Sequence, residues 1–146
     1  MLKPINIFFI FTILASRFLP HPPNFTPVIA IFMLTGGLSL LPLLITYMIT
    51  DAVIGFHSYM LWVYASLFAI AYFQRGAVFS STLFFVVTNF AVWTGGWYGY
   101  TLEGLLTCYI MAIPFFVNML ISTLIFAQVF KYVKTHTLNA PKFQFA

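Results

Sequence analysis

Charged residues are scarce in this chain. Its 146 residues include six Lys and Arg and two Asp and Glu, so 5% are charged, whereas soluble domains carry about a quarter. Hydrophobic residues make up 62% of the sequence. Such a chain has too few polar side chains to cover a surface that faces water. The composition therefore excludes a soluble globular protein and predicts an integral membrane protein.

Cysteine and catalytic motifs are also lacking. Cys108 is the single cysteine, which excludes an internal disulfide and a cysteine-based metal cluster. The histidines at 21, 57 and 136 have no metal-ligand spacing, and there is no Ser-His-Asp set, phosphate loop or H-E-x-x-H motif. We therefore expect no enzyme activity, no catalytic residue and no metal, and no motif identifies a cofactor. An A-x-A-like cleavage site is missing, so the first apolar run resembles a signal anchor.

The six cations are dispersed rather than gathered into a nucleic-acid-binding patch. Lys131, Lys134 and Lys142 lie together near the C-terminus, the pattern of cations that orients membrane proteins with this end in the cytoplasm. We expect the lipid bilayer as partner and no nucleic acid. The membrane would be a bacterial cytoplasmic (inner) membrane or an organellar inner membrane.

The apolar runs are long and do not alternate polar with apolar residues, which excludes a membrane β-barrel. A helical span needs about 20 residues, and three of the five runs are shorter. The runs are Ile5–Phe18, Val28–Phe56, Met60–Phe73, Val78–Thr94 and Leu102–Phe130.

The second run would form a helix of roughly 43 Å, longer than the ~30 Å bilayer core. Either it is one tilted helix, or it breaks at Gly36–Gly37 into two, the first partly re-entrant. The last run contains Pro114 and predicts one kinked helix, or a surface helix leading into a span. The expected fold is an all-α transmembrane bundle of six short helices, with five as the alternative. Residues 1–131 would form this domain and 132–146 a short basic polar tail.

With six spans, both termini face the cytoplasm and most polar features face outward. The proline-rich segment SRFLPHPPNFTPV at 16–28 is stiff and too rich in polar groups for a simple connector. It supplies three candidate ligand-binding residues, Arg17, His21 and Asn24.

Five more candidates follow along the chain. Asp51 is the only acid in the central apolar region, so it is either functional or an interfacial cap, and we expect it to pair with Arg17. Asn89 would bond across to another helix or contact a ligand. Trp93 belongs to an aromatic belt or to a lid over a ligand. The others are His57 and Glu103.

Four motifs carry a family resemblance. RFLPHPPNFTPV at 17–28, D-x-x-x-G-F-H at 51–57, FF-x-x-TNF-x-VW at 84–93 and T-x-E-G-LL-x-CY-x-x-A-x-PF at 101–115 resemble a family of small uncharacterised bacterial multi-pass membrane proteins, a domain of unknown function. The resemblance covers roughly residues 17–130. It implies a break between two helices near Gly36–Gly37.

The layout is also similar to the substrate-binding components of energy-coupling-factor vitamin transporters. This likeness implies a compact six-helix protein that binds a micronutrient from the outer side. The first helix, INIFFIFTILASRF, lacks the A-x-x-x-A pattern that docks the transporter module; Ala65 and Ala69 have that spacing on a later helix.

Two functions therefore compete. The first is binding or transport of a small molecule through the outer-face residues. The second is a non-catalytic accessory subunit of a larger respiratory or photosynthetic membrane complex, which the 19 Phe and the small extramembrane mass favour.

Overall fold

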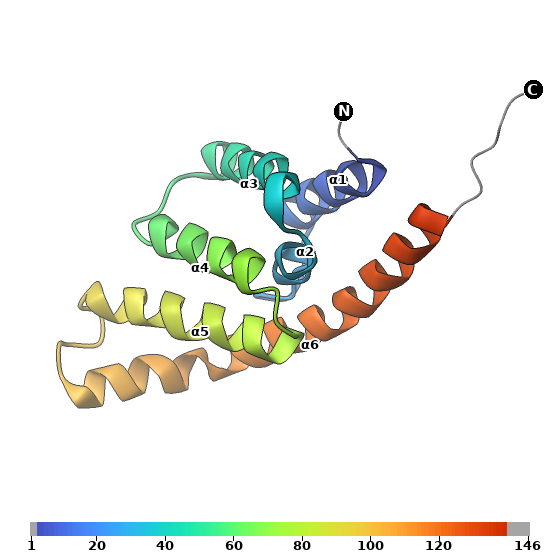
Figure 1. The fold of residues 1–146 in the computed structure, drawn as a ribbon. Helices are drawn as coiled ribbons and strands as arrows, with labels where there is room; N and C mark the ends of the chain where they lie inside the picture. The colour runs from blue at the N-terminus through green and yellow to red at the C-terminus, as the bar shows by residue number, and fades with distance from the viewer. Residues whose placement is uncertain (1–2, 140–146) are drawn as a thin grey trace, which may run out of the picture.

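The structure is a computed structural model that describes residues 3–139. These residues form six α-helices and one 3₁₀ turn, with no strand among them (Figure 1). The elements are α1 (Pro4–Phe18), α2 (Val28–Leu34), η1 (Gly37–Ser39), α3 (Leu40–Ile54), α4 (Met60–Phe73), α5 (Ala77–Thr94) and α6 (Leu102–Asn139). The predicted all-α class and six helices are confirmed.

Proline and glycine set most of the helix boundaries. Pro4 begins α1, where its missing N–H costs nothing. Leu19 leaves the helical region directly before Pro20, which ends α1. Gly55, with φ +123°, follows α3, and Gln74, with φ +47°, ends α4. Pro114 lies inside α6, which bends along its length in Figure 1.

The second apolar run is broken, as its glycines predict. After α2 the chain is extended at Thr35 and Gly36, and Gly37 adopts φ +61° at the start of η1. The seven-residue helix α2 is buried on every side from Val28 to Met33. A helix that is apolar all round belongs in an interior. It lies in the centre of the molecule, in contact with α4, α5 and α6.

The chain runs back and forth between two ends of the molecule. Lys3, Gly36–Gly37, Gln74 and Lys134 line one cavity, so the start of α1 and the end of α6 lie at the same end (Figure 1). We call this the basic end, since its lining includes two lysines. The opposite end, the loop end, carries the α3–α4 and α5–α6 connections, while the α1–α2 loop lies against the middle of α6.

Apolar side chains cover the outside as well as the interior. Phe11, Phe68, Val78 and Ile110 are each 58–67% exposed. Three segments are long and apolar enough to cross a membrane: Gly37–Ile54, Ala77–Thr94 and Leu102–His136. Helices α1 and α4 are apolar but shorter, so six complete spans remain a prediction.

The C-terminal end of α6 extends further than the apolar run. The helix continues through Asn139, so the first part of the predicted tail, from Tyr132, is helical. The rest of that tail, with Lys142, lies outside the described residues.

Replacing Gly37 by Ala should reduce the free energy of unfolding by about 1 kcal/mol, because a Cβ disfavours the left-handed backbone. Nothing lies within 4 Å of an added Cβ, so the cost is conformational. Gly37→Asn should lose less, since Asn tolerates this conformation. Unfolding in mixed micelles measures both; equal losses for Ala and Asn would contradict the explanation.

Candidate functional site

A buried ion pair joins the last turns of α1 and α3. Nη2 of Arg17 contacts Oδ1 of Asp51. The Asp51 side chain is 5% exposed and that of Arg17 21%. A carboxylate at this depth needs a compensating charge, which the guanidinium provides. The predicted pairing of these two residues is confirmed.

Two tyrosines complete the network. Tyr47 lies one turn before Asp51 on α3, and its hydroxyl accepts a hydrogen bond from Nη1 of Arg17 at 3.1 Å. The guanidinium also lies 4.6 Å from the centre of the Tyr47 ring. From α4, the hydroxyl of Tyr64 donates to Oδ2 of Asp51. Both carboxylate oxygens are therefore engaged, and three helices meet at one polar cluster.

The α1–α2 loop is held against the middle of α6. Asn118 Nδ2 donates to the carbonyl of Pro23 at 3.1 Å, and Ser122 Oγ donates to the carbonyl of Thr26 at 3.2 Å. Asn24 has φ +59°, which Asn tolerates better than most residues. The loop is thus fixed by long-range contacts as well as by its prolines.

Asn118→Ala should weaken the attachment of this loop by about 0.5–1.5 kcal/mol, the net value of one hydrogen bond. Hydrogen exchange of the loop amides at 21 and 24–26 should accelerate accordingly. Thr107→Ala is the matched control, because the Thr107 hydroxyl bonds only to a carbonyl of its own helix. Unchanged loop exchange in Asn118→Ala would show that the prolines alone hold the loop.

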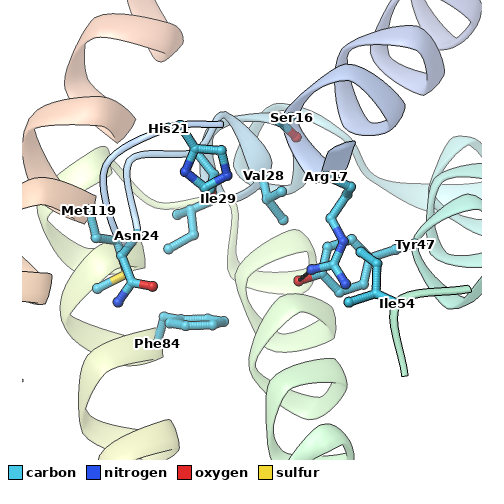
Figure 2. A pocket seen from close by; sticks show the side chains of 11 residues that line it. Ser16, Arg17, His21, Asn24, Val28, Ile29, Tyr47, Ile54, Phe84 and Met119 are labelled. Carbon is cyan, nitrogen blue, oxygen red and sulfur yellow. Dashed lines mark hydrogen bonds between the residues drawn. The ribbon is translucent and has the colours of Figure 1, made fainter. Parts of the chain in front are cut away.

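A cavity of about 330 Å³ opens beneath this loop (Figure 2). We call it the loop cavity. His21 and Asn24 border it on one side, Phe84 on another, and Arg17 with Tyr47 on a third. The remaining lining residues are Ser16, Thr26, Val28, Ile29, Ile54 and Met119.

A second cavity of about 320 Å³, the side cavity, adjoins the first. The two share four lining residues, Asn24, Tyr47, Phe84 and Met119. The side cavity adds polar groups from the α3–α4 connection and from α5, together with apolar groups: His57, Val63, Phe85, Thr88, Asn89, Val92, Ala112, Phe115 and Phe116. Each cavity is at the lower end of the size range of ligand pockets, about 300–1,000 Å³.

The paired cavities combine aromatic walls with neutral polar groups. Phe84 and Tyr47 supply ring surfaces, while Asn24 and Thr88 supply hydrogen-bonding groups. The single formal charge in the two linings, on Arg17, is already paired with Asp51. This chemistry suits an uncharged molecule with an apolar face and a hydrogen-bonding edge.

Five of the eight predicted ligand-binding residues border these cavities: Arg17, His21, Asn24, His57 and Asn89. Asp51 lines neither cavity, but it forms the ion pair that positions Arg17, which does line the loop cavity. The side-chain amide of Asn89 donates to the carbonyl of Phe85 on its own helix rather than across to another helix. Among the described residues, no group of three or more His, Cys, Asp or Glu could hold a metal ion.

Trp93 and Glu103 line neither cavity. The indole N–H of Trp93 donates to the carbonyl of Gly99 at 3.0 Å and so fastens the α5–α6 turn. Glu103 is exposed in the first turn of α6, where its negative charge interacts favourably with the helix dipole. Thr101 caps the same helix by accepting from the N–H of Gly104.

The sequence interpretation missed Tyr47, Tyr64, Phe84 and Met119. Tyr47 was within reach, because it lies four residues before Asp51 on the same helix face. The other three come from α4, α5 and α6, and no local pattern indicates which ring or thioether borders a cavity.

Comparisons with known proteins identify the family but no function. No curated protein and no solved structure matches the chain. The likeness to energy-coupling-factor components therefore remains a prediction. One family model, described as a family of unknown function (DUF6580), matches residues 3–141. Since the match spans nearly the whole sequence, the chain belongs to the DUF6580 family.

Proposed function

We propose that this protein lies in a membrane and binds a small, uncharged ring compound in its two adjoining cavities, as the capture step of uptake. The observation that carries the proposal is the shared lining of the cavities by Asn24, Tyr47, Phe84 and Met119. The shared residues make the two cavities neighbours beneath a fixed loop, and the proposed ligand would occupy both.

The lining favours a heteroaromatic ligand of the kind found among micronutrients. Phe84 and Tyr47 would contact the faces of a ring. The side chains of Asn24, His21 and His57 would bond to its polar edge, and the neutral lining selects against a strongly charged ligand. Binding of this kind needs no nucleophile or metal, so we propose a binding function rather than catalysis.

The bilayer is the proposed partner, in a bacterial cytoplasmic membrane or an organellar inner membrane. The exposed apolar residues on the long helices support this environment. The three long apolar segments support the passes that this proposal requires, and α1, α2 and α4 would complete the six. Cations at the basic end support a cytoplasmic position for both termini, so the site would open outward.

A thermal-stability screen tests the proposal. The full chain in lipid nanodiscs is heated with a panel of water-soluble heteroaromatic compounds, such as purines, pterins and pyridine carboxamides. A ligand at 100 times its Kd should stabilise the protein by about 2.7 kcal/mol. Thr88→Trp, which fills the side cavity, should remove the stabilisation. Ile110→Trp, on an exposed position of α6, is the matched control and should keep it.

Two outcomes would argue against the proposal. If a compound stabilises the wild type and Thr88→Trp equally, it binds elsewhere. If no compound stabilises the chain and it is recovered from its membrane only within a large assembly, the accessory-subunit function is favoured. The apolar exterior suits contact with other subunits as well as with lipid.

A further inference from the structure

A third cavity lies at the basic end, far from the proposed ligand site. It measures about 340 Å³ and lies between the start of α1, the link from α2 to α3, the end of α4 and the last part of α6. We call it the basic cavity. Its lining is Lys3, Ile5, Asn6, Phe9, Leu34, Thr35, Gly36, Gly37, Ser39, Gln74 and Lys134.

Among residues 3–139, the cations of the basic cavity have no acidic partner. Lys3 and Lys134 line it, and no carboxylate does. The two acids of the sequence are Asp51 and Glu103. Asp51 is paired with Arg17 at the loop end, and Glu103 lies at the start of α6 on that same end. Two uncompensated ammonium groups at one cavity favour an anion.

Lys134 is positioned rather than free at the surface. It is half-buried, and its Nζ lies 3.4 Å from the carbonyl oxygen of Leu34, at the C-terminal end of α2. A lysine in this place satisfies a carbonyl that has no partner within its helix. The contact draws the end of α6 towards the α2–α3 link and brings the charge to the cavity.

Asn6 is the second, independent indication of a ligand. It is 4% exposed and borders the basic cavity. Within residues 3–139 no hydrogen bond of its carboxamide is found, and its amide atoms are not fully enclosed by protein, so they are reached through the cavity. Side-chain amides in an interior nearly always have a hydrogen-bond partner, so an amide without a protein partner that faces a cavity beside two cations points to a group bound in that cavity.

We propose that the basic cavity binds a phosphate group. Lys3 and Lys134 would neutralise its charge, and the amides of Asn6 and Gln74 would donate to its oxygens. The Gln74 amide lies close against Gly36 at the wall of the cavity, since a Cβ on Gly36 would lie 2.5 Å from Nε2 of Gln74. Cytoplasmic orientation alone explains cations at this end, but it requires neither a cavity nor a buried amide.

The phosphate has two sources, the headgroup of an anionic phospholipid or a soluble phosphate compound. Two probes distinguish them in titrations of the full chain in neutral detergent at constant ionic strength. One is a short-chain phosphatidylglycerol, compared with a diacylglycerol of the same chains. The other is inorganic phosphate, compared with chloride. Native mass spectrometry measures lipid binding, and calorimetry measures phosphate binding.

Lys134→Gln should weaken binding of the phosphate probe by about ten-fold, and Asn6→Asp by more, because it places a carboxylate against the anion. Lys131→Gln is the matched control: it removes one charge from the same helix but does not line the basic cavity. The affinity of Lys131→Gln for the phosphate probe should change less than about two-fold. Asn6→Leu removes the amide without adding charge and serves if Asn6→Asp does not fold.

This pattern with either probe supports the site and identifies the source of the phosphate. An equal loss of affinity in Lys131→Gln would mean that the probe is held by general electrostatic attraction rather than by the basic cavity, and this would overturn the proposal. Binding of neither probe by the wild type, or binding that Lys134→Gln and Asn6→Leu leave unchanged, would also overturn it.

Discussion

Arg17→Gln and Asp51→Asn should each reduce the free energy of unfolding by about 3–5 kcal/mol, and the double variant should lose much less than their sum. The reason is burial: Asp51 is 5% exposed, and removal of its partner leaves a carboxylate with one tyrosine hydroxyl in an apolar setting. A water-exposed pair would contribute under about 1 kcal/mol. Denaturation in mixed micelles provides the four values of the cycle.

Arg75→Gln is the matched control for this cycle. Arg75 is exposed at the basic end, so loss of its charge should change stability by less than about 0.5 kcal/mol. Tyr64→Phe should cost about 1.5–3 kcal/mol, since it removes a hydrogen bond to a charged group. If the effects of Arg17→Gln and Asp51→Asn simply add, the two residues are not coupled.

Gly104→Ala should destabilise the protein by about 3 kcal/mol, the upper end of the range for overpacking. A Cβ on Gly104 would overlap the carbonyl oxygens of Tyr98 and Gly99. These are backbone atoms, so a side-chain rotation cannot relieve the clash. The first turn of α6 would have to move away from the α5–α6 turn. This movement would weaken the hydrogen bond from the Trp93 indole to the carbonyl of Gly99.

Gly76→Ala is the control for the second prediction. Gly76 has φ −64° and nothing lies within 4 Å of an added Cβ, so the loss should stay below about 1 kcal/mol. The same mixed-micelle unfolding measures both variants. A similar small loss for Gly104→Ala would mean that the turn is not packed as described.

The features that the sequence predicted correctly depend on local chemistry. Gly36–Gly37 permit a backbone that other residues resist, and the chain breaks there. An ionised Asp51 is so unfavourable in an apolar environment that the sequence predicts a cation close to it. Arg17 lies at the end of a neighbouring apolar run. The proline-rich loop is held by long-range hydrogen bonds and borders a cavity, while its role as a binding surface stays a prediction.

The features that were missed depend on packing between distant segments. The hydrogen bond from Tyr64 to Asp51 joins α4 to α3, two helices that do not pack along their lengths, and no spacing within either helix shows it. Asn118 is one polar residue in a long apolar run, and its role appears only when the α1–α2 loop lies against α6. The sequence indicates no role for Asn6, because the cavity that it borders is formed together with three other segments of the chain.

Native mass spectrometry of the purified full chain tests most directly whether the paired cavities hold a ligand. We expect the wild type and Ile110→Trp to carry an additional mass of a few hundred daltons, the size of molecule that pockets of about 300–1,000 Å³ hold. Thr88→Trp should lack that mass while keeping its fold. A bound molecule retained in full by Thr88→Trp, or no bound molecule on a folded wild type after supplementation with the screened compounds, would contradict a ligand site between the α1–α2 loop, α5 and α6.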